Sequence, residues 1–331
     1  MNGKSLYLLA LCMMYFISSC DVHEWPDMPD KTRFVLRLDY STEMTLWKFT
    51  YEDGRLTDNG LGDTYDSRLD SGRIRHIIRA YPLSDRNRPA RDYYSESIFI
   101  TEISGSYDCD LALDLPAGDY RIMVWSDFIH DVGDAYFYNP SNFSEITLRG
   151  VYTGDTDYRD AFRGVGEALL TTSVVEQPPT VLEIDMQRPL AKYEFISTDL
   201  QDFRQTNVDI NDCDVFFFYN GFMPDSYDMT SDRPNDVSEN ISFESAPEQI
   251  DANSVSLGFD YVFVNGKQSG VHVMVGLYDA EGRQLALSQS IQVPLMRSRH
   301  TVIRGSFLMT QNSGGIRINP GFDGNYNIVI K

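Results

Sequence analysis

The sequence of 331 residues predicts an all-β protein, and three observations support this fold class. Apolar residues alternate with polar ones at a period of two in many segments, as they do in half-buried strands. Aromatic residues, which strands favour, are abundant at 20 Tyr, 19 Phe and 3 Trp. Few helix-length amphipathic windows separate the alternating segments, which favours antiparallel β-sandwiches over a repeated βα pattern.

The first half of the chain begins with an alternating segment at 34–40, in which every second residue is apolar. A second alternating segment, 111–115, is followed by Pro-Ala-Gly-Asp at 116–119, which has the composition of a tight turn. The alternation resumes at 120–124. We therefore predict a hairpin with one face in water, and minor, short helical turns near 158–162.

The second half repeats this pattern. Residues 223–248 are rich in Pro, Asp, Ser and Asn without periodicity, which predicts a long exposed loop. Two prolines near residue 178 precede a last strand of the first half, and Arg188-Pro189 restarts the pattern, so we expect a domain boundary near residue 187. The remaining predicted strands of this half are 190–196, 255–263, 271–278 and 283–293.

The first twenty residues resemble an export signal. Lys4 precedes an uncharged apolar run at 6–17, which is too short to span a bilayer and suits a signal peptide. The following Ile-Ser-Ser-Cys resembles a bacterial lipobox, which predicts cleavage between Ser19 and Cys20 and acylation of Cys20. An ordinary signal peptide followed by a chance cysteine is the alternative. Residues 1–19 are thus a predicted leader and 20–31 a predicted tether.

The charge and the cysteine content argue against several classes of protein. The chain carries 28 Lys and Arg against 49 Asp and Glu, a net charge of −21, which argues against nucleic acid as a partner. Apart from Cys12 in the leader and Cys20, only Cys109 and Cys213 remain. Two separately buried thiols are favoured over one disulfide bridge between them.

No motif in the sequence indicates an enzyme. The five histidines are scattered without metal-ligand spacing, and no nucleophile elbow, phosphate loop or dinucleotide fingerprint occurs. We therefore predict no catalytic residue, no metal and no cofactor. A glycosidase-like pair of carboxylates remains an alternative, because such residues meet only in the fold.

Two local clusters offer alternatives of a different kind. Asp155, Asp157 and Asp160 could offer oxygens to calcium, but they lack EF-hand spacing, and a solvated loop is favoured. Aromatic residues at 136–138 could form a platform for sugar rings, although aromatic β-cores explain most such residues.

Several segments, taken together and in order, resemble one family of bacterial surface lipoproteins. These segments are 20–26, 115–125 with its Pro-Ala-Gly-Asp-Tyr turn and Val-Trp end, 188–192 and 293–305. They are similar to fimbrial subunits of the FimB/Mfa2 type and related two-domain surface lipoproteins of Bacteroidetes. The closing segment, 316–330, resembles the tails of neighbouring fimbrillin-like groups as much as those of the anchor subunits.

The resemblance implies two transthyretin-like antiparallel β-sandwich domains in tandem, at 32–187 and 188–331. It also implies a lipid-anchored cell-surface subunit, of anchor or accessory type, in a type V-like pilus that supports adhesion. The expected partners are other fimbrial subunits, the outer membrane through the N-terminal palmitate-type lipid, and a host or bacterial surface ligand. A surface glycan-binding lipoprotein without a fibre is the alternative.

The mechanism implied for such subunits is β-augmentation, in which an extended segment of one chain completes a sheet of the next. Tyr326, Ile328 and Ile330 form a candidate donor strand, and pairing of this tail within its own domain is the alternative. In related stalk subunits, cleavage after an arginine opens an acceptor groove. Arg33 and Arg37 are the candidate processing sites, whereas an anchor subunit would keep its lipid and remain uncut.

Overall fold

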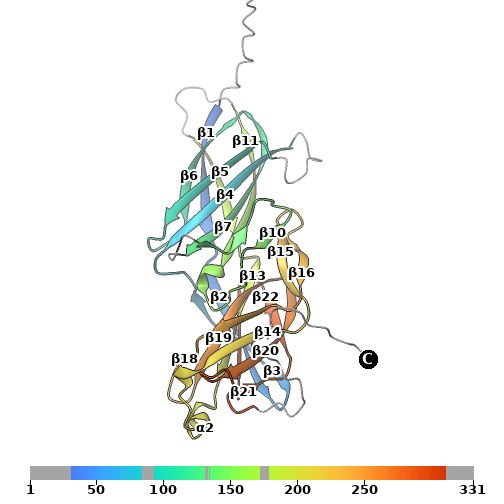
Figure 1. Cartoon of the computed structure of the whole chain (residues 1–331). Helices are drawn as coiled ribbons and strands as arrows, with labels where there is room; N and C mark the ends of the chain where they lie inside the picture. The colour runs from blue at the N-terminus through green and yellow to red at the C-terminus, as the bar shows by residue number, and fades with distance from the viewer. Residues whose placement is uncertain (1–30, 84–92, 131–132, 134, 172–178, 311–331) are drawn as a thin grey trace, which may run out of the picture.

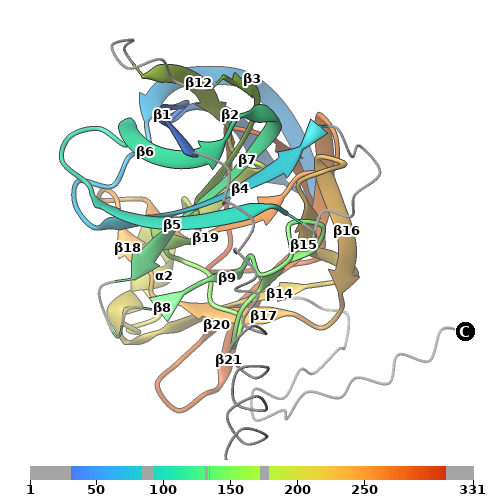
Figure 2. The ribbon, with the colours of Figure 1, turned by 90° about the horizontal axis from the view of Figure 1, so that it is seen from above.

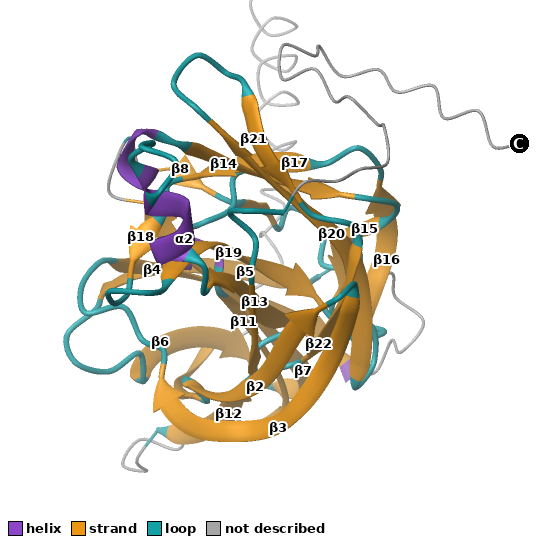
Figure 3. Ribbon diagram, turned by 90° about the horizontal axis from the view of Figure 1, so that it is seen from below, coloured by secondary structure: helices purple, strands orange, loops and turns teal. Residues whose placement is uncertain are grey.

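The computed structural model of the chain describes residues 31–83, 93–130, 133, 135–171 and 179–310. The predicted leader, Cys20, the tether and the candidate donor strand at Tyr326, Ile328 and Ile330 lie outside these residues. The all-β prediction is confirmed, because 63% of the described residues lie in strands and 5% in helices. Figure 3 shows how strands dominate, with α2 at the periphery. The described helical elements are η2 (Asp157–Arg159), α2 (Leu200–Arg204) and η3 (Ile210–Asp212).

An upper sandwich is built from two sheets (Figure 1). The first has the order β12-β1-β6, with β1 parallel to β12 and antiparallel to β6. The second has the order β11-β7-β4-β5, with β8 beside β7. Figure 2 shows the two sheets as layers, one above the other. Their strands are β1 (Lys31–Tyr40), β6 (Cys109–Pro116), β12 (Thr180–Met186), β4 (Arg73–Pro82), β5 (Ser95–Glu102), β7 (Gly118–His130), β8 (Ala135–Tyr136) and β11 (Ala161–Leu170).

The alternation read from the sequence decides which side chains fill this sandwich. Phe34, Leu36 and Leu38 of β1 are completely buried, whereas the residues between them point outward. Leu111 and Leu113 of β6 face the same core. Burying large apolar side chains contributes about 1.5–3 kcal/mol each, so this pattern fixes the register of both strands.

A lower sandwich contains the other two large sheets. One has the order β18-β19-β13-β23-β2-β3, and the other has β17-β14-β20 followed by β21 and β22, which pair with opposite halves of β20. Strand β23 runs parallel to both β13 and β2. The strands are β2 (Glu43–Glu52), β3 (Arg55–Asp66), β13 (Leu190–Ser197), β18 (Glu248–Gln249), β19 (Val255–Phe263), β23 (Arg299–Gly305), β14 (Asp214–Tyr219), β17 (Ser242–Ser245), β20 (Gln268–Tyr278), β21 (Gln284–Leu287) and β22 (Ile291–Met296).

A fifth sheet, in the order β16-β15-β10-β9, lies where the two sandwiches meet. It joins strands from both halves of the chain, and a third apolar core gathers beneath it around Trp125, Tyr138 and Tyr227. The two sandwiches therefore share a continuous packed junction. The strands of this sheet are β9 (Tyr138–Asn139), β10 (Ile146–Leu148), β15 (Met223–Asp228) and β16 (Arg233–Ser238).

Two sequence-based expectations are wrong in this region. The segment 223–248 is not a long exposed loop, because it forms β15, β16 and β17. The turn at 116–119 does not close a hairpin, because β6 and β7 belong to opposite sheets of the upper sandwich. The outer face of β7 is wet only at its start, where Asp119 and Arg121 are exposed, because Met123 and Trp125 further along are buried by the junction core.

The hairpin β2–β3 crosses the boundary expected near residue 187. Figure 1 places β1 in the upper half of the molecule and β2 and β3 in the lower half. The hairpin joins the lower sandwich through β23, with Trp47 opposite Thr301. Asp53 and Gly54, both at positive φ, form its two-residue turn. The division at 187 remains a proposal for the two domains, with β2 and β3 as an insertion into the second.

Among the residues described, no helix combines the length and the apolar character that crossing a bilayer requires.

Candidate functional site: strand edges and the sandwich junction

Both candidate processing arginines lie on the outer face of β1. The Arg33 guanidinium donates to the Asp114 carboxylate, with 3.1 Å between Nε and Oδ1. Arg37 Nε donates to Asp110 at 2.9 Å, and its Nη1 donates to Glu183 on the other flank at 3.2 Å. Hydrogen bonds from these guanidinium groups lower the pKa of Asp114 and of Asp110. These pairs tie β1 to both neighbouring strands.

The backbone on either side of these arginines is held in a ladder. β1 pairs with β12 through Phe34–Tyr40 and with β6 through Lys31–Leu38. A protease needs an extended, accessible segment, whereas β1 is the central strand of its sheet. The bonds after Arg33 and Arg37 are therefore protected while β1 remains paired.

Among the described strands, β5 forms one edge of the upper sandwich. This strand pairs with β4 and ends its sheet, and its side chains alternate between the core and the surface. Ile98 and Ile100 point outward and are 57% and 52% exposed. An eight-residue edge with adjacent exposed isoleucines offers both unpaired main-chain groups and apolar side chains to an added strand.

The aromatic residues at 136–138 do not form the platform considered from the sequence. Tyr138 is 1% exposed, and its hydroxyl donates to the Arg159 carbonyl inside the junction. The ring of Tyr136 is covered by the Arg75 guanidinium, 3.8 Å from the ring centroid. The Tyr138 ring and one face of the Tyr136 ring are thus occupied by contacts within the protein and are not available for stacking on a ligand.

The acidic residues at 155–160 hold the junction together and are not a solvated loop. Asp157 accepts hydrogen bonds from Lys192 Nζ and the Tyr261 hydroxyl, each at 2.7 Å. Asp160 is buried against Arg188, with 2.7 Å between Oδ2 and Nε. Across the described part of the chain, no group of three or more His, Cys, Asp or Glu could hold a metal ion.

Sequence reasoning missed the ionic network that joins the two sandwiches. Arg188 donates to Asp160, to the Ser41 carbonyl at 3.0 Å and to the Ser67 hydroxyl at 2.6 Å. Arg159 is paired with Asp260 of β19. In the sequence, the Arg-Pro pair at the expected boundary and the acidic cluster at 155–160 marked this region, but neither carried information about partners.

The two cysteines are separate, unpaired thiols, as predicted. Cys109 lies in β6 at the edge of the upper core, and Cys213 precedes β14 in the lower sandwich. Burial raises the pKa of each thiol to about 11, so both are protonated at neutral pH. They behave as small apolar side chains rather than reactive groups.

These features define a class of β-sandwich proteins whose prominent surfaces are strand edges and a rigid junction. Within this class, the chain belongs to the DUF6562 family, a family of unknown function, whose model matches residues 34–331. No curated protein matches the sequence.

Several solved structures are similar to this chain at low identity. A protein proposed to be an adhesin from Bacteroides ovatus is 11% identical with a TM-score of 0.42, covering 86% of this chain and 93% of that one. The fimbrial anchor protein Mfa2 from Porphyromonas gingivalis is 11% identical with a TM-score of 0.37, covering 77% and 82%. The tip fimbrial protein Mfa3 from the same organism is 9% identical with a TM-score of 0.38, covering 82% and 94%.

Proposed function

We propose that the chain is a non-enzymatic, lipid-anchored cell-surface subunit of a type V-like pilus, of anchor or accessory type, which binds its neighbours by β-strand augmentation. The observation that carries this proposal is the open edge at β5, with Ile98 and Ile100 exposed beside unpaired main-chain groups. An extended segment of another subunit would add to this edge, and its alternate side chains would cover the isoleucines.

The geometry of β1 supports the uncut, anchor-type form. Phe34, Leu36 and Leu38 fill the upper core, so the loss of residues up to Arg37 would remove buried apolar area from the sandwich. In the proposed anchor, β1 stays paired and acylated Cys20 holds the protein to the outer membrane. In a stalk subunit, cleavage after Arg33 or Arg37 would precede assembly, and a tail strand at 326–330 would act as donor.

Mass spectrometry of the protein purified from assembled fibres tests this proposal. We expect an N-terminus of acylated Cys20 and copurifying fimbrial subunits. An N-terminus that follows Arg33 or Arg37 would instead make the chain a polymerising subunit. Acylated Cys20 without any fibre partner would overturn the fibre role and favour a glycan-binding surface lipoprotein.

A further inference from the structure

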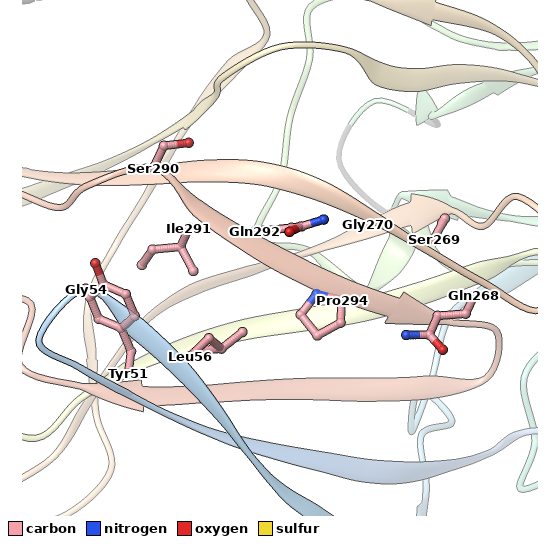
Figure 4. A pocket seen from close by; sticks show the side chains of 10 residues that line it. All are labelled: Tyr51, Gly54, Leu56, Gln268, Ser269, Gly270, Ser290, Ile291, Gln292 and Pro294. Atoms are coloured by element: carbon pink, nitrogen blue, oxygen red, sulfur yellow. The ribbon is translucent and has the colours of Figure 1, made fainter.

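A groove opens in the lower sandwich between the β2–β3 turn and the edge strand β22 (Figure 4). Its volume is about 560 Å³, within the range of small-molecule sites. Tyr51 and Leu56 line it from the hairpin, while Ile291 and Pro294 line it from β22. The groove lies in the lower sandwich, whereas β5 lies in the upper one (Figure 1).

The lining of this groove carries no charge, in a chain whose net charge is −21. Its polar groups are two amides, two serine hydroxyls and the hydroxyl of Tyr51, and unlike a carboxylate or an ammonium group each of these both donates and accepts hydrogen bonds. Alcohol groups of a ligand have the same dual character. Besides Tyr51, the polar residues are Gln268, Ser269, Ser290 and Gln292.

The strand pairing places the amides of Gln268 and Gln292 on either side of a position that has no long side chain. The side chain of Gln268 in β20 points to the same face of the sheet as those of Gln292 and Pro294 in β22, because side chains alternate along a strand. Gly270 occupies a position on this face without a side chain. Gly270 lies directly opposite Pro294, so no long side chain occupies the middle. The two amides lie roughly 13 Å apart along the strands, estimated from a rise of 3.3 Å per residue.

An aromatic ring completes the lining. Tyr51 is half-buried and stacks on Phe307 of the lower core, with ring centroids 5.6 Å apart and an interplanar angle of 13°. This packing fixes the ring, so binding a ligand costs little side-chain entropy. A rigid aromatic face beside dual-character polar groups matches a pyranose, which has an apolar C–H face and a rim of hydroxyls.

We infer that this groove binds a neutral saccharide. The absence of lining charges disfavours sialylated or uronic sugars, which would bring a carboxylate without a cationic partner. A peptide strand along the β22 edge is the competing occupant, but the lining offers no run of exposed apolar side chains like that on β5. The inference goes beyond the proposed pilus role, because it does not depend on fibre assembly.

An array of neutral oligosaccharides, with their sialylated and glucuronylated counterparts, tests the inference on the full chain purified in detergent. Titration calorimetry then measures the dissociation constant for the best neutral sugar. We expect Gln268→Ala and Gln292→Ala each to weaken binding at least threefold, and the double variant at least tenfold. Gln284→Ala, an exposed amide of β21 outside the groove, is the matched control and leaves binding unchanged.

Tyr51→Leu, which keeps apolar volume against Phe307, should weaken binding at least tenfold. Should this variant not fold, the two amide variants still decide the question, because their side chains are exposed. Binding of no neutral sugar overturns the inference. It is equally overturned by a preference for charged sugars, by sugar binding that the amide variants leave intact, or by capture of an extended peptide instead. The amide variants should assemble into fibres normally, so failure here is distinguishable from failure of the pilus proposal.

Discussion

Arg159 and Asp260 form a buried ion pair across the sandwich junction, with 3.2 Å between Nε and Oδ1 and side-chain exposures of 4% and 0%. Arg159 belongs to η2, which follows β10 along the chain, and Asp260 belongs to β19 of the lower sandwich. The carboxylate also accepts hydrogen bonds from the hydroxyls of Tyr152 and Tyr219, at 2.5 and 2.6 Å. The Arg159 guanidinium lies over the Tyr152 ring, 4.2 Å from its centroid.

Asp260→Ala should therefore destabilise the protein strongly. It leaves the Arg159 charge buried without its partner and two tyrosine hydroxyls without their acceptor. Removing one partner of a buried pair costs about 3–5 kcal/mol, which urea unfolding measures as a lower midpoint. Asp114→Ala breaks an exposed pair with Arg33 and is the control, because such pairs contribute little. Equal midpoints for the two variants would contradict the role given to the junction.

This pair also shows the limit of prediction from sequence. Alternation in the first strand correctly predicted that Phe34, Leu36 and Leu38 face a core, because the period of side chains is a local property. No local pattern in the sequence indicated that Arg159 would pair with Asp260, which lies about a hundred residues away. The acidic residues near Arg159 looked solvated for the same reason, since their partners Lys192, Tyr261 and Arg188 all lie in the second half of the chain.

The sequence also did not predict which strands share a sheet. A period of two tells which residues share a face, but it does not tell which strand lies alongside. Pro116 and Gly118 fit a tight turn and fit equally well a crossing between two sheets, which is what the chain makes there. The same ambiguity hid the position of β2 and β3 in the lower sandwich, because the residues of a hairpin do not tell which sheet it joins.

Strand β11 approaches β12 so closely at Gly164 that we expect only glycine to fit there without strain. A Cβ added to Gly164 would lie 2.4 Å from Ile184 Cγ2 and 2.5 Å from Met186 Sδ, both buried. Gly164→Ala should cost about 1–3 kcal/mol, because overpacking forces side chains or backbone to shift. Thermal unfolding measures this cost as a lower Tm.

The matched control for that substitution is Gly62→Ala in β3. Its added Cβ would also approach within 2.4 Å, but the contacting atom is Cε of Lys48, at the end of a flexible side chain. Gly62→Ala should leave Tm nearly unchanged. A similar loss of Tm in both variants would show that the contact with β12 does not account for the effect.

The buried His76 predicts a loss of stability in acid. Its Nδ1 lies 2.8 Å from the Tyr40 hydroxyl and its Nε2 lies 2.8 Å from the Thr101 hydroxyl, and burial lowers its pKa from 6.5 to about 4. Between these two values the unfolded chain binds a proton that the folded protein does not. Stability from this residue is therefore complete above pH 6.5 and falls by about 3 kcal/mol as the pH drops to 4.

Urea unfolding across that pH range, compared with His76→Gln, measures this contribution. Asp155 acts in the opposite direction, because burial raises its pKa to about 6 and the folded protein gains that proton first. It is present in both proteins, so the difference between them isolates His76. We expect the stability difference between the two proteins to shrink as the pH falls from 6.5 to 4. A difference that stays constant would exclude a neutral buried histidine.

The exposed edge at β5 leads to a prediction that distinguishes an effect on assembly from an effect on folding. Ile98→Lys and Ile100→Lys place charges on an edge strand, which natural sheets use to prevent strand addition. Both side chains are more than half exposed, so Tm should stay the same, while recovery of fimbrial subunits with the purified protein should fall at least tenfold. Val151→Lys adds the same charge at a residue that is 91% exposed and outside every strand, so recovery should match that of the unaltered protein. Undiminished recovery from the two β5 variants would place the contact with neighbouring subunits at another edge.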